Sequence, residues 1–257
     1  MRLAITGSAG RIGRELVEEL SDTHDLCLID RVRVPSRKSC VVDLARHRVR
    51  SYSRPWSKTS LPSWMSLFDG IDVVVHLAAH SQVEATWTSV NRNNIQVTWN
   101  VIEAAARCGV PRVVFASSNW AVKSMELKLA PDCYLPQGPK IHSDVLPCPV
   151  TAYGLSKAMG ELTGRMFVDE GRLTSFIAVR IGWYNQVPPK DQIGRTRWIG
   201  PADIRSLFRR CVEAEVQGFH VVYGVSAQAA SPYDLSYTRQ LLLWEPKQLL
   251  PEDEVLF

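Results

Sequence analysis

A glycine-rich turn directly after the first strand-like run constrains the fold of this chain more than any other feature. Residues 2–6 (RLAIT) form a short apolar run, and the sequence TGSAGRIG at residues 6–13 places glycines at positions 7, 10 and 13. Residues 11–20 then carry apolar side chains at helical spacing. A strand, a tight turn and a helix in this order predict the first unit of a doubly wound α/β sheet.

The alternation of strands and helices continues to residue 182. Further strands are expected at residues 25–30, 40–44, 71–76, 112–118 and 175–182, and helices at about 88–108 and 152–170. We therefore expect an α/β fold with a parallel Rossmann sheet in residues 1–182.

The pattern is less regular at two places. Residues 119–150 hold five prolines and show little periodicity, which predicts a long loop over one face. After residue 182 we expect a helix at 201–214, a strand at 220–224, a short helix near 234–243 and a loose tail from 251. Residues 183–257 would form a small substrate-binding lobe that is not an independent domain.

Composition and charge exclude several classes of protein. With 257 residues, 46% of them hydrophobic, the chain can bury a core without disulfides or a metal. No apolar run approaches the roughly 20 residues of a membrane span, and the six cysteines include no C-x-x-C pair. Aromatic residues are not interleaved in a repeating way among the basic residues of 31–58, which favours a solvated surface over a nucleic-acid interface. A reduced, cytoplasmic protein with no metal site is expected.

The glycine turn has the features of a pyrophosphate site. Gly7, Gly10 and Gly13 let the backbone approach phosphates, and the helix that begins with Arg11 and Ile12 offers unpaired N–H groups.

Asp30 follows Gly13 by 17 residues and ends the second strand. An acid at this position binds the adenosine ribose hydroxyls and disfavours a 2′-phosphate, so NAD is favoured over NADP. Arg31, the next residue, could nevertheless accommodate that phosphate.

Further residues at the strand ends complete the expected cofactor site. Asp43, followed by Leu44, could accept a hydrogen bond from the adenine amino group, and the small residues of HLAAHS at 76–81 would let the cofactor lie close. That segment supplies Leu77, Ala78 and Ala79. At the end of the fifth strand, Ser118 could hydrogen-bond a substrate oxygen and Asn119 could orient a second polar group.

Tyr153 and Lys157 lie four residues apart in the helix expected at 152–170, which places them on one face. A lysine ammonium and an oxidised nicotinamide ring would both favour the tyrosine phenolate and lower its pKa. Tyr153 could then exchange the proton of a substrate hydroxyl while hydride moves, and Lys157 could also hold the nicotinamide ribose.

The three glycines, Asp43, HLAA, Ser118 and Tyr153-x-x-x-Lys157 resemble the extended short-chain dehydrogenase/reductase superfamily, in which the Ser–Tyr–Lys trio is catalytic. Within it the chain is most similar to the uronate dehydrogenases, which oxidise C1 of free hexuronic acids with NAD. Segments at 111–119, 153–157, 179–182, 220–227 and 241–247 carry this likeness. The resemblance implies cofactor contacts for Asn94 and for Ile181 of VRIG, and substrate contacts for Ser81, Ser118 and Asn119.

The chain departs from the uronate dehydrogenases at two positions. Trp183 stands where they have a serine near the substrate, and their carboxylate-binding arginine has offset counterparts here in Arg195 and Arg197. We take Trp183 and Arg195 as substrate-binding candidates.

Three functions remain open at this point. The first is an NAD-dependent dehydrogenase of a sugar or sugar acid, and the second is a nucleotide-sugar epimerase, although the short segment after residue 182 argues for a smaller substrate. The third is an NAD-sensing regulator, against which the tyrosine–lysine pair argues. The resemblance also implies a homodimer or higher homo-oligomer, with Trp99, Met159 and Met166 on the two long helices supplying contact.

Overall fold

The sheet of this protein contains seven parallel strands in the described residues. The computed structural model describes residues 1–35, 37–46 and 62–250. The strand order is β3-β2-β1-β4-β5-β6-β9. This is the doubly wound order: β2 and β3 are added on one side of β1, and the later strands are added on the other side, beginning with β4. The strands are β1 (Arg2–Thr6), β2 (Asp25–Asp30), β3 (Cys40–Val41), β4 (Val73–His76), β5 (Arg112–Ser118), β6 (Ser175–Ile181) and β9 (Gly218–Gly224).

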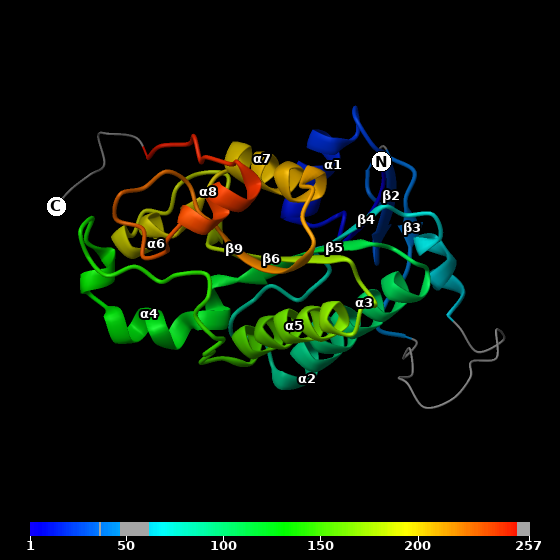
Figure 1. Cartoon of the computed structure of the whole chain (residues 1–257), viewed down its shortest axis with the longest axis horizontal. Coiled ribbons are helices and arrows are strands. Elements are labelled where there is room, and N and C mark those ends of the chain that lie inside the picture. Colours follow the sequence, from blue (N-terminus) through cyan, green and yellow to red (C-terminus); the bar gives the residue numbers. More distant parts are fainter. Residues whose placement is uncertain (36, 47–61, 251–257) are drawn as a thin grey trace.

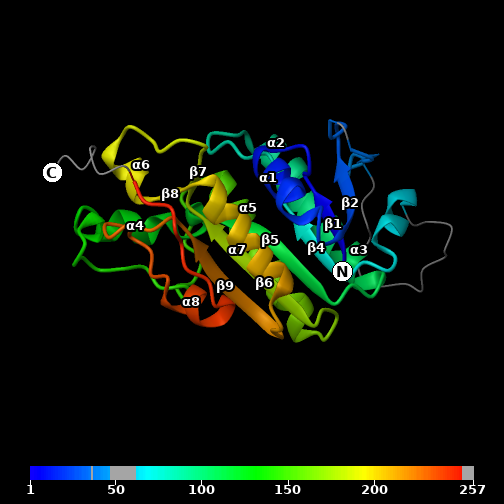
Figure 2. The same ribbon diagram turned by 90° about the horizontal axis from the view of Figure 1, so that it is seen from above.

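Helices cover both faces of the sheet (Figures 1 and 2). One face carries α1 (Arg11–Leu20) and α7 (Pro201–Glu213), which pack against each other. The other carries α2 (Trp87–Val90), α3 (Val97–Arg107) and α5 (Ala152–Asp169). The remaining helices are α4 (Lys123–Leu129), α6 (Gln192–Thr196) and α8 (Ser236–Leu242), with 3-10 turns at Ser63–Phe68, Asn119–Val122 and Asp132–Tyr134.

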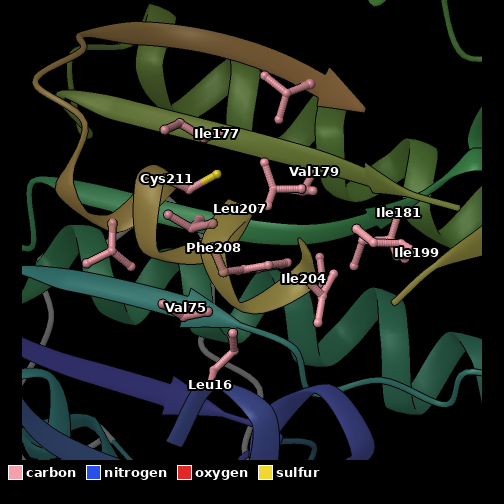
Figure 3. Packing of buried hydrophobic residues seen from close by; sticks show 14 of the residues in the cluster. Leu16, Val75, Ile177, Val179, Ile181, Ile199, Ile204, Leu207, Phe208 and Cys211 are labelled. Atoms are coloured by element: carbon pink, nitrogen blue, oxygen red, sulfur yellow. The ribbon is translucent and has the colours of Figure 1, made fainter. Parts of the chain in front are cut away.

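The core lies in two layers, one on each side of the sheet. Figure 3 shows the layer beneath α7, where Leu207, Phe208 and Cys211 pack onto Ile177 and Val179 of β6. These side chains are fully buried. Because burying one such apolar side chain is worth about 1.5–3 kcal/mol, this layer fixes α7 and β9 to the first half of the chain.

The C-terminal segment is therefore part of the main sheet as well as a lobe. β9 pairs with β6 over seven residues, from Ser175 opposite Gly218 to Ile181 opposite Gly224. Residues 183–200 lie outside this sheet and contain the short pair β7 (Trp183–Tyr184) and β8 (Trp198–Ile199). A division of the chain at residue 182 is too early for the sheet.

The predicted loop at 119–150 is wrong in its first half, where α4 and two 3-10 turns follow β5. Helices of three to seven residues are too short to show a periodic apolar face, which explains why the sequence pattern missed them. Figures 1 and 2 show α4 and α6 at the same end of the molecule.

The helix expected at 88–108 is a continuous helical segment with a wide π turn at Asn91–Gln96 between α2 and α3. Such turns are frequent at functional sites. The predicted third strand is shorter than expected, because only Cys40 and Val41 pair with β2.

Parts of two predictions lie outside the described residues: the basic residues Arg48, Arg50, Arg54 and Lys58, and the tail from 251. Within the described part of the chain, no helix combines the length and apolarity that crossing a membrane requires. The same residues contain no group of three His, Cys, Asp or Glu side chains placed to hold a metal ion.

Candidate active site

Two adjoining cavities lie at the carboxyl ends of the central strands. The smaller has a volume of about 270 Å³ and is lined by the ends of β1, β2 and β4. The larger has a volume of about 580 Å³ and adds residues from β5, α5 and the segment after β6. Gly7, Gly10, Leu77 and Ala79 line both cavities, so the two form one continuous trough.

The glycine turn after β1 has little room for side chains. Gly7 has a φ of +75°, a left-handed conformation that favours glycine. A Cβ at Gly13 would lie 2.3 Å from the carbonyl oxygen of Gly7, so α1 can pack against the turn only with glycine there. No side chain caps the start of α1 at Gly10, and residues 10–13 line the larger cavity. The turn therefore fits a pyrophosphate, which would accept the free N–H groups.

Asp30 is held in one orientation at the end of β2. Its carboxylate accepts hydrogen bonds from the backbone N–H groups of Ala9, Arg31 and Val32 at 2.9, 2.6 and 3.2 Å. It lines the smaller cavity, and of its roughly four acceptor positions one is left for a ribose hydroxyl. Arg31 lines the same cavity and donates to Asn93 Oδ1 at 3.1 Å.

The rest of the smaller cavity is mainly apolar. Leu44 and Ala78, both predicted, line it together with residues that the sequence analysis did not identify: Ala9, Val32, Val42, Asn93 and Val97. Asp43 also lines it, but its Oδ2 lies 3.0 Å from Arg92 Nη2. One oxygen of this carboxylate is thus already engaged by a cation.

Asn94 lies behind the cavities, although the resemblance implied a cofactor contact. It is buried in the π turn, where its Oδ1 accepts the N–H of His80 at 2.7 Å. Its Nδ2 donates to the His80 carbonyl at 3.1 Å and to Ser156 Oγ at 3.0 Å. These three bonds use both amide protons and tie the segment after β4 to α5, so Asn94 can position its neighbours.

Tyr153 and Lys157 lie at the wall of the larger cavity, and the buried Ser118 is next to Tyr153 without being part of that lining. Both members of the α5 pair line it, and the Lys157 Nζ lies 5.7 Å from the centre of the Tyr153 ring. The ammonium donates to the carbonyl of Ala116 at 2.7 Å. Ser118, the last residue of β5, is hydrogen-bonded to the Tyr153 phenol and accepts the N–H of Trp120 at 3.2 Å. This arrangement places a proton-transfer group beside a cation.

Burial controls the titration of this pair. It raises the pKa of Tyr153, while the hydrogen bond with Ser118 acts in the opposite direction. Burial also lowers the pKa of Lys157 from 10.5 to about 8. In the free protein desolvation is thus the larger influence on the pKa of Tyr153, and the expected lowering, which requires an oxidised nicotinamide ring beside the lysine, stays a prediction for the protein with its cofactor bound.

The substrate side of the larger cavity differs from the sequence prediction at its arginine. Arg197 lines this cavity, whereas Arg195 is buried in the last turn of α6 and is not among the residues of either lining. α6 ends between the two arginines, at Thr196. The predicted residues Ile181, Ser81, Asn119 and Trp183 all line the cavity.

Other lining residues of this cavity had no signal in the sequence. They are Val83, Glu84, Ala116, Ser117, Trp120, Gly182 and Tyr184. A buried carboxylate behind the cavity, Glu126, was also missed. The i,i+3 spacing of Lys123 and Glu126 was the only local sign of it, since its other partners come from distant segments.

The strand order, the glycine turn and the residues around it define a dinucleotide-binding α/β enzyme. The model of the NAD dependent epimerase/dehydratase family matches residues 3–183, and the chain belongs to this family. NAD is its cofactor, and the expected kinship with extended short-chain dehydrogenases is confirmed.

Curated relatives cover nearly the whole chain. An NAD-dependent glucose-6-phosphate dehydrogenase of Haloferax volcanii is 34% identical over 95% of this chain and 92% of its own length. A uronate dehydrogenase of Agrobacterium fabrum is 32% identical over 96% of this chain and 84% of its own. The crystal structure of uronate dehydrogenase from Agrobacterium tumefaciens superimposes with a TM-score of 0.77, at 30% identity, covering 96% of this chain and 84% of that one.

Proposed function

We propose that this protein oxidises a hydroxyl of a free sugar that carries an acidic group, with NAD as the oxidant. The observation that carries the proposal is the larger cavity, where Tyr153 and Lys157 share one wall with the glycine turn and Arg197 lies among the substrate-side residues. Two relatives support an acidic sugar, because by their names one acts on glucose 6-phosphate and the other on a uronate.

The chain's own residues fit the requirements of NAD. The glycine turn and residues 10–13 would hold the pyrophosphate, Asp30 the adenosine ribose, and Lys157 the nicotinamide ribose. When bound, NAD supplies the hydride acceptor. The preference of the protein for NAD over NADP would come from Asp30, whose carboxylate is fixed by three backbone N–H groups.

Tyr153 would remove the proton from the substrate hydroxyl. The Lys157 ammonium lies 5.7 Å from the centre of the Tyr153 ring, and a positive charge this close favours the phenolate form. This contribution from Lys157 opposes the burial that raises the pKa of Tyr153. Ser118, hydrogen-bonded to the phenol, would hold the hydroxyl oxygen in line with it.

The charge of the larger cavity favours an anionic substrate. Arg11, Lys157 and Arg197 line it, against a single carboxylate from Glu84 among the described residues. Arg197 would bind the acidic group, and Trp183, which is 43% exposed, would cover one face of the sugar. Residues 183–200 thus serve as the substrate-binding part of the C-terminal segment.

The test measures the formation of NADH or NADPH with a panel of free uronic acids, aldose phosphates, neutral aldoses and nucleotide sugars. NADH formed with an acidic free sugar, and weakly or not at all with the neutral one, is the expected result. If chromatography shows that a nucleotide sugar is converted while no net NADH forms, the protein is instead an epimerase. A protein that binds NAD and turns over none of them would be a sensor.

We further propose that the protein is a cytoplasmic homodimer or higher homo-oligomer. Leu155, Met159 and Leu162 are exposed on the outer face of α5, at helical spacing. Of the three residues expected at this interface, Trp99 and Met166 pack partly against the protein's own core, and Met159 remains exposed. Light scattering of the purified protein checks the oligomeric state.

A further inference from the structure

Behind the larger cavity, one fully buried carboxylate collects four polar partners. Glu126 on α4 is 0% exposed. Its Oε1 accepts hydrogen bonds from Lys123 Nζ and from the Tyr134 hydroxyl, both at 2.6 Å, and lies 3.4 Å from Arg197 Nη1. Its Oε2 accepts the Tyr233 hydroxyl proton at 2.5 Å. Burial favours the neutral acid, but Arg197 and these hydrogen bonds outweigh it and lower the pKa of Glu126.

Two of these partners lead directly to the cavity. Arg197 lines it, and its Nε donates to the carbonyl of Ile193 at 3.2 Å. Tyr233 accepts a hydrogen bond from Asn119 Nδ2 at 2.8 Å, and Asn119 also lines the cavity. Glu126 therefore links Asn119, which directly follows β5, to Arg197, which directly precedes β8. The link to Asn119 runs through Tyr233.

The links fix the orientation of both side chains. Because Asn119 donates to Tyr233, its amide cannot rotate, and its Oδ1 stays 3.2 Å from Ser118 Oγ. Arg197 is held by one carboxylate oxygen and one carbonyl, which orients the plane of its guanidinium. A planar guanidinium binds a carboxylate or phosphate well only when that plane is correctly presented.

We propose that Glu126 is a positioning residue that sets the preference of this enzyme for a substrate with an acidic group, acting through Arg197 and Asn119. This inference rests on the proposed function. Glu126 does not reach the substrate. It holds the cation that binds the acidic group and the amide beside Ser118 in a fixed relation to each other.

A contribution to folding stability is a weak explanation for the buried Glu126 carboxylate and its partners. Burying a carboxylate and its partners carries a desolvation cost that well-packed apolar residues avoid. Here the partners come from residues 123–134, 197 and 233, three segments that meet behind the substrate side of the cavity.

Glu103 provides a matched control. It is 1% exposed and pairs with Arg107 at 2.6 Å and Arg172 at 2.9 Å. It lies near the C-terminal end of α3, outside the linings of both cavities. Neutralising Glu103 therefore removes a buried carboxylate of the same kind without touching the substrate site.

The experiment compares Glu126→Gln and Glu103→Gln with the wild type, with an acidic and a neutral sugar as substrates. We expect Glu126→Gln to raise KM for the acidic sugar about tenfold or more, with kcat and the KM values for NAD and the neutral sugar changed no more than about twofold. Glu103→Gln should lower Tm and leave the ratio of kcat/KM for the two sugars unchanged.

A double-mutant cycle separates positioning from general destabilisation. If Glu126 acts through Arg197, adding Glu126→Gln to Arg197→Ala should raise KM for the acidic sugar by no more than about twofold. Multiplicative effects, or equal losses with both sugars, would overturn the inference. If Glu126→Gln does not fold, Tyr134→Phe removes one anchor of the carboxylate, and an unchanged sugar preference in that variant would overturn it as well. A wild type that oxidises no acidic sugar would overturn the proposed function itself.

Discussion

Replacement of Lys157 by methionine tests whether the buried ammonium of the active site lowers the stability of the folded protein. The lysine is 5% exposed, and burial lowers its pKa from 10.5 to about 8. A buried ammonium without a carboxylate partner is unfavourable at neutral pH. Methionine fills a similar volume without a charge, so we expect Lys157→Met to be inactive and yet more stable than the wild type.

The magnitude follows from linkage between protonation and folding. Between pH 8 and 10.5, the unfolded chain carries a proton on this lysine that the folded chain lacks, so the wild type gains stability as the pH rises through that window. The lowered pKa costs the folded state about 3 kcal/mol at about pH 7 and about 1 kcal/mol at about pH 10. The hydrogen bond from Nζ to the Ala116 carbonyl is available to both protonation states and therefore cancels between the two conditions.

The assay is urea unfolding of the wild type and Lys157→Met at both pH values, without added nucleotide. The advantage of the variant in free energy of unfolding should fall by about 2 kcal/mol from about pH 7 to about pH 10. Lys190→Met, at an exposed lysine, serves as the control for the general effect of removing a positive charge. A difference between Lys157→Met and the wild type that is the same at both pH values would refute the reasoning.

Four further substitutions test the acid–base group, the cofactor preference and the glycine turn. Tyr153→Phe should lower kcat by about 10²–10⁴-fold with an unchanged Tm, because it removes only the ionisable oxygen, and full turnover in a folded variant would contradict this role. Asp30→Ala should shift the ratio of kcat/KM for NAD over NADP toward NADP, since Arg31 remains beside the site; an unchanged ratio would show that Asp30 does not set the preference. Gly13→Ala should lower the free energy of unfolding by about 1–3 kcal/mol, since overpacking has costs of this size. Gly10→Ala should cost less, because its Cβ would approach only the Gly7 carbonyl, at 3.1 Å, and equal losses would contradict the packing argument.

The local patterns of the sequence were sufficient for the sheet. Apolar runs predicted β1, β2 and β5 to the residue, and the amphipathic pattern did the same for α1. A strand that is buried on both faces and a helix that is buried on one face leave a mark in the spacing of apolar residues. The same holds for Tyr153 and Lys157, whose relation is fixed by one helix.

Contacts between distant segments left no such mark. The sequence analysis named Arg195 and Arg197 and took Arg195 as the candidate, whereas in the structure Arg197 lines the cavity and α6 ends between the two. Asn94 was expected at the cofactor, but the π turn directs its amide to the backbone of His80. The raised pKa of Tyr153 depends on burial, which a residue spacing does not report.

The sequence by itself determined the class of fold, the family and the cofactor, and placed Tyr153 and Lys157 on one face of a helix, because each depends on residues that are close along the chain or repeat with a fixed period. Only the tertiary structure decided which arginine lines the cavity and which groups hold it. The network around Glu126 joins side chains up to 114 residues apart, from Asn119 to Tyr233. Their meeting is a consequence of how β9 and the segments around it pack against the sheet, and no spacing within a single element encodes it.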